Sequence, residues 1–253
     1  MDESRIKLWK KEEKAPFQCW DFSYIEGRYR EEKPDWDYVS LAKQYVKKSH
    51  AVLDMATGGG EVFSQILQDR KPPKAIAIEG YKPNVSVARK NLKDFGVKVI
   101  YANETKKLPF EDGEFDFVLN RHGGLNVKEI SRILLPNGVF ISQQVDCRNL
   151  KDLMRLFGAR PKWEFNTLRQ RTMQLADAGF EIDMAKEWKG KVHFYDIGAL
   201  VYFLKAIPWL VYDFSVEKYS EVLEKFHVKL ERSGELQFRI RRFILIAHKI
   251  DSS

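Results

Sequence analysis

A short apolar run that breaks into three consecutive glycines is the feature that most constrains this chain. Residues 51–61 read Ala-Val-Leu-Asp-Met-Ala-Thr-Gly-Gly-Gly-Glu. The apolar part is too short for a helix and suits a buried parallel strand. Apolar residues recur at helical spacing directly after the glycines, at Val62, Phe63, Ile66 and Leu67. The sequence therefore predicts a strand, a glycine turn and a helix.

A turn of this kind is suited to an anionic or nucleotide-like ligand, although a plain tight turn is the alternative. Glycine lets the backbone approach a ligand closely, and the helix N-terminus offers free N–H groups and a positive dipole end. A second apolar run, residues 75–78, ends at Glu79, about twenty residues after Gly60. A carboxylate at that position can accept hydrogen bonds from both hydroxyls of an adenosine ribose. NAD and S-adenosylmethionine both satisfy these features.

The spacing of the glycines favours S-adenosylmethionine over NAD. A dinucleotide fingerprint G-x-G-x-x-G would use Gly58 and Gly60, but its third glycine position holds Phe63. A phenylalanine there impedes the close packing of helix and strand that a pyrophosphate loop requires. The dinucleotide interpretation is therefore weaker.

The same turn spells D-x-A-x-G-x-G with Asp54, Ala56, Gly58 and Gly60, and this resembles the first motif of class I S-adenosylmethionine-dependent methyltransferases. Ala56 stands where that family usually has glycine. The resemblance continues through Glu79, which matches the acid of the second motif.

Two later segments resemble the ubiquinone-biosynthesis type, the methyltransferase type 11-like enzymes. Residues 104–116 are similar to the D-A-x-x-L-P-F…F-D pattern, with Glu104 in place of the aspartate and Thr105 in place of the alanine. Residues 129–138 are similar to the E-x-x-R-x-L-x-P-G-G segment that leads into the fifth strand. The resemblance covers residues 51–145 and implies a methyltransferase with S-adenosyl-L-methionine as cofactor. The cofactor-binding residues that we expect from it are Asp54, Ala56, Thr57, Gly58, Gly59, Gly60, Glu79, Gly80, Tyr81, Glu104, Thr105 and Asn120.

The predicted fold class is α/β, with the seven-stranded Rossmann-like sheet of the resembled family and an antiparallel last strand beside the fifth and sixth. Residues 139–145, 180–188 and 240–248 read as strands five to seven, and residues 167–178 as a helix that Gly179 ends. We also expect Asn84 to cap the helix after Glu79 and Asp116 to have a structural role.

The predicted organisation is an N-terminal cover over residues 1–50, the cofactor-binding core over 51–189, a cap insert over 190–239 and the last strand over 240–253. The cover and the insert are rich in aromatic residues. The N-terminal aromatics predict either a hydrophobic helix pair against the sheet or a segment that closes over the acceptor, and both can hold. The insert is far longer than an ordinary loop. We expect its apolar surface to cover the edge of the sheet that binds the ligand, because a large patch would otherwise be exposed.

The acceptor is expected at the carboxyl ends of strands four and five, as in open α/β sheets generally. His122 is the candidate base, because its ordinary pKa near 6.5 suits removal of a proton at neutral pH, although a lone histidine is more often structural. A base is needed only if the acceptor must lose a proton. The residues expected to bind the acceptor are Arg121, Gln143, Gln144, Phe203 and Trp209.

Composition limits the partners without identifying the acceptor. The chain has 253 residues, a net charge of +7 and no N-terminal secretory segment or membrane-spanning apolar run, so we expect a cytoplasmic protein without a membrane partner. Cys19 and Cys147 are far apart in sequence, which argues against a disulfide framework, and no metal site is expected. Basic residues occur in small groups, so a small-molecule acceptor is preferred to RNA. The alternatives are an RNA base methyltransferase and a non-catalytic protein that binds S-adenosylmethionine; the oligomeric state stays open.

Overall fold

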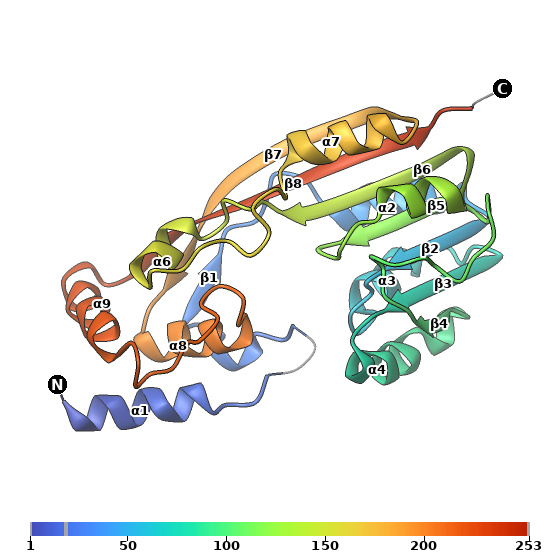
Figure 1. Cartoon of the computed structure of the whole chain (residues 1–253). Coiled ribbons are helices and arrows are strands. Elements are labelled where there is room, and N and C mark those ends of the chain that lie inside the picture. Colours follow the sequence, from blue (N-terminus) through green and yellow to red (C-terminus); the bar gives the residue numbers. More distant parts are fainter. Residues whose placement is uncertain (1, 18–19, 252–253) are drawn as a thin grey trace. The chain divides into compact units, whose positions relative to one another are not determined.

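The computed structural model describes residues 2–17 and 20–251, and these residues divide into two compact units (Figure 1). Unit 1 comprises residues 1–34, 147–165 and 188–241, and unit 2 comprises residues 35–146, 166–187 and 242–253. The N-terminal segment and the long insert therefore fold together with a third segment, residues 147–165.

The helices and strands alternate along much of the chain, as the α/β prediction requires. The α-helices are α1 (Glu3–Glu13), α2 (Tyr38–Val46), α3 (Glu61–Leu67), α4 (Lys82–Leu92), α5 (Val127–Ile133), α6 (Lys151–Leu156), α7 (Leu168–Asp177), α8 (Ile197–Ala206) and α9 (Ser220–Ser233), with short 3-10 helices at Ser23–Ile25 and Lys93–Phe95. The strands are β1 (Tyr29–Glu31), β2 (Ala51–Met55), β3 (Lys74–Glu79), β4 (Lys98–Tyr101), β5 (Phe115–Arg121), β6 (Leu134–Val145), β7 (Phe180–Phe194) and β8 (Leu236–Lys249).

The strand order is β1-β7-β8-β6-β5-β2-β3-β4. Strands β2 to β6 pair in parallel, and β8 runs antiparallel to β6 with Val139 opposite His248. The α/β class and the antiparallel last strand are confirmed. The sheet has eight strands and not seven, because β1, in the N-terminal segment that we expected to be helical, pairs antiparallel with the end of β7, Tyr29 opposite Phe194.

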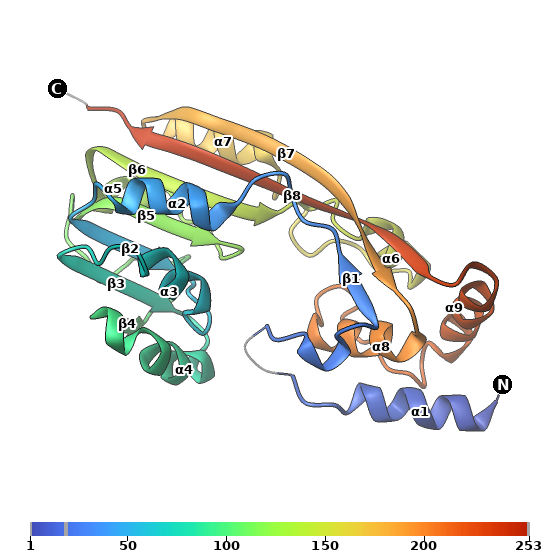
Figure 2. The ribbon, with the colours of Figure 1, turned by 180° about the vertical axis from the view of Figure 1, so that it is seen from behind.

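The sheet of unit 2 buries both of its faces, which explains the uninterrupted apolar strands in the sequence. Successive residues of a strand point to opposite faces, so Val52 packs with helices α2, α3 and α4, while Leu53 packs with α5 and α7. Figure 2 shows α2 on one face of the sheet and α7 on the other. The parallel strands that result end at one edge, where the polar residues of the site follow them.

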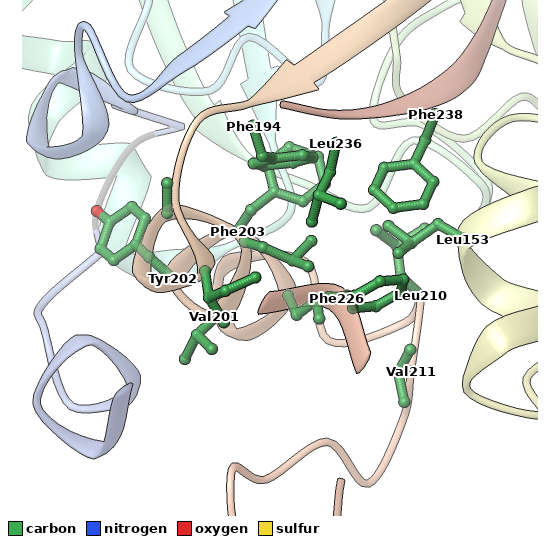
Figure 3. Close-up of a cluster of buried hydrophobic side chains, with 14 of the residues drawn as sticks. Leu153, Phe194, Val201, Tyr202, Phe203, Leu210, Val211, Phe226, Leu236 and Phe238 are labelled. Carbon is green, nitrogen blue, oxygen red and sulfur yellow. The ribbon is translucent and has the colours of Figure 1, made fainter. Parts of the chain in front are cut away.

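Unit 1 has a hydrophobic core of its own, which contains side chains from α1, α6, α8, α9 and the adjacent ends of β7 and β8. Helix α8 is apolar on every side, and all of its residues except Lys205 are buried. Figure 3 shows Phe203 of α8 close to Phe194 of β7 and Leu236 of β8. The insert buries its apolar side chains within its own unit, so their burial does not require the sheet edge, and the role of the insert as a cap stays a prediction.

An ion-pair network joins the N-terminal segment to the insert within unit 1. The Arg28 guanidinium contacts Asp196 at 2.8 Å and Glu12 at 3.1 Å. The Asp196 carboxylate also accepts the N–H of Ala199 at 2.8 Å and so caps α8. The N-terminal residues therefore help to fix the first turn of α8.

Two local predictions need correction and one is confirmed. Strand β7 extends to Phe194 and β8 begins at Leu236, so the connection between them is residues 195–235, shorter than predicted. Asn84 is not the N-cap of α4, because the helix begins at Lys82 and Pro83 occupies its first turn, where proline is favoured. Asp116 is structural, since its carboxylate accepts the N–H groups of His50 and Ala51 at 2.7 and 3.2 Å.

Candidate functional site

The carboxyl ends of parallel strands meet at one edge of the sheet in unit 2, and the predicted cofactor residues follow these ends. Met55 ends β2 and pairs with Asn120 of β5, while Ile78, the next-to-last residue of β3, lies opposite Met55. Asn120 in turn pairs with Ser142 of β6. The register therefore brings the glycine turn, the acid after β3 and the polar residues of β5 and β6 together.

The glycine turn adopts backbone conformations that disfavour side chains. Gly58 and Gly60 have φ of 64° and 85°, and Ala56 has φ of 56°. A Cβ at Gly60 would lie 2.7 Å from Cγ of Leu92, a buried core residue, whereas a Cβ at Gly58 would have no atom within 4 Å. Bulk at Gly60 therefore disturbs the core, and bulk at Gly58 occupies the open space beside the turn.

The carboxylate of Glu79 connects the turn to the end of β3. One of its oxygens accepts the N–H of Gly58 and the other accepts the N–H of Tyr81, each at 2.7 Å. Burial raises the pKa of Glu79, and the two backbone hydrogen bonds oppose that shift. Each carboxylate oxygen can accept a further hydrogen bond, so the pair of hydroxyls on a ribose fits this acid.

Glu104 and Thr105 occupy the loop after β4. The Glu104 carboxylate accepts the N–H of Gly124 at 3.0 Å. The backbone N–H and the hydroxyl of Thr105 donate to the side-chain oxygen of Asn103, at 2.9 and 2.7 Å. The loop is therefore held by its own side chains. The adenine contacts implied by the family resemblance stay a prediction.

Asp54 is a buried acid with an altered ionisation. It is 7% exposed, and burial raises its pKa to about 7, with Thr57 and Arg121 opposing the shift and Glu79 adding to it. The neighbouring Tyr38 hydroxyl is buried and has no hydrogen-bond partner among the described residues. A buried hydroxyl without a partner is costly, so this position favours a polar ligand group.

Asn120 and Gln144 form a buried amide pair on the sheet face that carries α5 and α7. The Gln144 amide donates to the Asn120 oxygen at 2.6 Å and to the Ser142 hydroxyl at 2.9 Å. Asn120 also bonds the turn that follows β5, accepting the N–H of Gly123 at 3.2 Å and donating to the oxygen of Gly124 at 3.1 Å. These contacts fix the turn, and the predicted ligand contacts of both residues stay untested.

Gln143 and His122 lie on the opposite face, beside α2. The side-chain nitrogen of Gln143 is 3.1 Å from Nε2 of His122, and its oxygen accepts the indole N–H of Trp36 at 2.7 Å. The pKa of His122 is well below its ordinary value, because nearby groups desolvate the ring and the cations Arg121 and Arg242 are close. Because the residue as a whole is exposed, we attribute the lowered pKa of His122 chiefly to these two cations. His122 is therefore neutral at neutral pH.

The two predicted aromatic contacts belong to unit 1. Phe203 is 4% exposed, and its ring centroid is 5.2 Å from that of Phe194 and 5.6 Å from that of Phe22. Trp209 is half-buried and contacts Trp20 at 5.5 Å and Trp163 at 5.9 Å between ring centroids. A contact between either residue and the acceptor stays a prediction.

Trp36 and Tyr38 are site residues whose roles the sequence did not reveal. Both precede or begin α2, whose start is signalled by the Asp37 N-cap, which accepts the N–H of Val39 at 3.0 Å. The helix could have been placed from that signal. The contact between Trp36 and Gln143 could not, because it depends on how α2 packs against β6.

The site fits the cofactor that the sequence implies. Open space beside Gly58, spare acceptor capacity on Glu79 and the unpartnered Tyr38 hydroxyl together suit a ligand with hydroxyl and charged groups. Among the described residues, no group of three or more histidines, cysteines or acids could hold a metal ion. Cys147 forms no disulfide within the described part of the chain, and Cys19 lies outside the described residues.

Comparison with known proteins identifies the same stretch of chain. A family model described as a methyltransferase domain matches residues 53–142. The chain is 25% identical over 186 residues to a demethylmenaquinone methyltransferase of Staphylococcus saprophyticus, an alignment that covers 62% of this chain and 80% of that protein. It is 30% identical over 109 residues to a demethylmenaquinone methyltransferase of Thermus thermophilus, covering 40% of this chain and 48% of that protein.

The fold is also found in solved structures. A putative methyltransferase from Bacillus halodurans superposes with a TM-score of 0.59 and 19% identity, over 84% of this chain and 99% of that one. The similarity in fold thus extends well beyond the residues that the family model matches.

Proposed function

We propose, from the premise that this chain is a class I S-adenosylmethionine-dependent methyltransferase, that it methylates a small ring-bearing acceptor of the quinone class. The observation that carries the proposal is that the glycine turn, Glu79 and Asn120, all within the matched stretch 53–142, follow or end neighbouring parallel strands of unit 2. The demethylmenaquinone methyltransferases to which the chain is similar supply the class of acceptor.

Glu79, Asp54 and the glycine turn would hold the cofactor. When bound, S-adenosylmethionine supplies an electrophilic methyl group, and the electrons of the broken carbon–sulfur bond stay on sulfur while an electron pair of the acceptor forms the new bond. The chain's residues act mainly by positioning and by excluding water, which is enough for an in-line displacement.

Asp54 would match the positive charge of the cofactor. Its raised pKa means that part of the free protein carries a protonated Asp54 near neutral pH. A cationic ligand favours the ionised form. Cofactor binding at pH 6 should therefore release a proton, and calorimetry in buffers of different ionisation enthalpy measures that release.

The residues proposed for the acceptor are Arg121, Gln143, Gln144 and His122, with Phe203 and Trp209 as contacts from unit 1. Support for the first four is their place at the ends of β5 and β6. Phe203 and Trp209 rest on the sequence alone. The division into cover, core and cap segments belongs to the same proposal, as does a cytoplasmic location.

Among the described residues, no helix is long and apolar enough to span a membrane.

The decisive experiment measures methyl transfer from labelled cofactor to a reduced, short-chain demethylmenaquinone analogue. We expect labelled product with the wild type and none with Gly58→Val, which fills the space beside the turn at a position of φ 64°. Gly27→Val, also at positive φ but in unit 1, is the matched control and should retain activity.

Two further arms separate the alternatives. Total RNA replaces the quinol in one arm, and strongly salt-dependent methylation of RNA would favour the RNA enzyme, because released counterions make such binding salt-sensitive. In the other arm, cofactor binding without product from the quinol, from a host metabolite extract or from RNA would favour a non-catalytic binding protein.

A further inference from the structure

Three side chains of unit 2 form a hydrogen-bonded series that ends at the proposed acceptor site. The indole of Trp36, just before α2, donates to the side-chain oxygen of Gln143 on β6, and the Gln143 nitrogen faces Nε2 of His122. The backbone N–H of His122 also donates to the carbonyl of Gln143 at 2.8 Å, and His122 has φ of 64°. Gln143 therefore holds the backbone of His122 through its carbonyl and contacts the imidazole through its side chain.

The donor chemistry of these groups determines where the proton of His122 resides. An indole nitrogen can only donate, so the atom of Gln143 that it contacts must be the amide oxygen. The remaining amide nitrogen can only donate as well, so Nε2 of His122 must accept. A neutral imidazole that accepts at Nε2 carries its proton on Nδ1. The Nδ1–H is then the group of the ring that can donate to a ligand.

This arrangement conflicts with a role as general base. A base must offer a lone pair to the proton that it removes. The only lone pair of the imidazole, on Nε2, already accepts the Gln143 amide. The positive charges of Arg121 and Arg242 further oppose the formation of an imidazolium.

We propose that His122 acts as a neutral hydrogen-bond donor, with Trp36 and Gln143 as the positioning residues that fix its Nδ1–H form. Resting on the proposed function, this assigns the acceptor a carbonyl or anionic oxygen next to the atom that receives the methyl group. The Nδ1–H donates to that oxygen and favours its ionised form, whose electron pair is then available to form the new bond. A proton displaced from the acceptor leaves to water, and His122 stays neutral throughout.

The tautomer is tested directly by nitrogen NMR of the free protein labelled at histidine. The chain has five histidines, and the signals of His122 are those that His122→Asn removes. At pH 7 we expect protonated Nδ1 and unprotonated Nε2. An Nε2–H tautomer or an imidazolium in the wild type at pH 7 would overturn the proposal.

Two variants test the positioning residues. Trp36→Phe removes the donor that orients Gln143, so both tautomers should appear and kcat/KM for the quinol should fall about tenfold, as for one lost hydrogen bond. Gln143→Glu places a carboxylate beside Nε2, which should protonate it and raise the pKa of His122. Unchanged nitrogen signals in both variants would contradict the proposal.

The control is Trp188→Phe, which alters a tryptophan of unit 1 and should leave the His122 signals unchanged. The quinol acceptor and the donor role of His122 can fail separately. If no quinol is methylated but the Nδ1–H form and its dependence on Trp36 are observed, the acceptor is wrong and the positioning is right. If the quinol is methylated and His122 is an imidazolium, only the donor role fails.

Discussion

Units 1 and 2 bury polar groups to very different extents. Of the eleven buried polar or charged residues in the described part of the chain, nine belong to unit 2, and Asn149 and His193 belong to unit 1. Several of the nine lie at the carboxyl ends of strands, among them Asp54, Glu79 and Asn120. Burying polar groups costs free energy unless they are paired, so their concentration marks the unit shaped by a ligand.

Unit 1 is built instead on aromatic packing. Its core contains ring contacts among Phe194, Phe203, Phe226 and Phe238, with centroids 5.2 to 6.2 Å apart. Its buried His193 is paired with the Glu235 carboxylate at 2.8 Å. The apolar side chains of unit 1 thus contribute to the stability of that unit, whereas the buried polar groups are concentrated in unit 2.

The largest expected effect is on the stability of unit 1. Phe203→Ala removes a fully packed ring, and such changes cost about 3 to 5 kcal/mol. Hydrogen exchange should increase in the amides of unit 1, while cofactor affinity in unit 2 is kept. Turnover of the acceptor should fall more than cofactor binding. Equal loss of protection in both units would show that they do not unfold separately.

The next effect concerns cofactor binding in unit 2. Glu79→Ala removes a charged acceptor and should weaken cofactor binding by about 1.5 to 3 kcal/mol, as measured by calorimetry. Glu79→Gln, which keeps one carbonyl acceptor, should lose less. NAD should not bind either protein. Wild-type affinity in Glu79→Ala, or saturable NAD binding, would remove the basis of the cofactor assignment.

A smaller effect follows from the buried acid of unit 2. The folded pKa of Asp54, about 7, lies above the ordinary 3.8, so the folded state holds the proton more tightly. The contribution of Asp54 to the free energy of unfolding is therefore greatest below pH 3.8. It declines as the pH rises from 3.8 to about 7, the folded pKa. Asp54→Asn should therefore be more stable than wild type at pH 8, on the order of 1 kcal/mol.

Urea unfolding at pH 5 and pH 8 measures this difference. The advantage of Asp54→Asn should be larger at pH 8 than at pH 5. A variant that is equally or less stable than wild type at both pH values would mean that Asp54 is ionised at no cost in the folded protein.

The smallest expected effect concerns Trp209, a half-buried aromatic residue of unit 1. Trp209→Ala removes ring contacts with Trp20 and Trp163, worth about 0.5 to 1.5 kcal/mol. Stability should change little, and kcat/KM for the acceptor should fall while cofactor affinity is kept. Unchanged turnover would exclude Trp209 from the acceptor site and leave it a surface residue.

The sequence by itself determined the strands, the glycine turn and the acid of unit 2. The reason is physical: a buried parallel strand is an apolar run, and a turn at positive φ favours glycine, so both leave a local signal. Glu79 could be identified as a ribose-binding acid because its separation from Gly60 in the sequence corresponds to one helix and one strand. A structural role was also expected for Asp116 from its place beside an apolar run, but its partners, the N–H groups of His50 and Ala51, are 66 and 65 residues away and depend on the fold.

Only the tertiary structure decided what the aromatic residues pack against and what His122 can do. Trp36 and Gln143 are 107 residues apart, and their hydrogen bond depends on the register of β6 and the packing of α2. Likewise, the apolar residues of the insert signal burial but do not specify a partner, and the partner proved to be the N-terminal segment with residues 147–165. Hydrophobic burial is non-directional, so composition predicts that a side chain is covered, and only the fold determines by what.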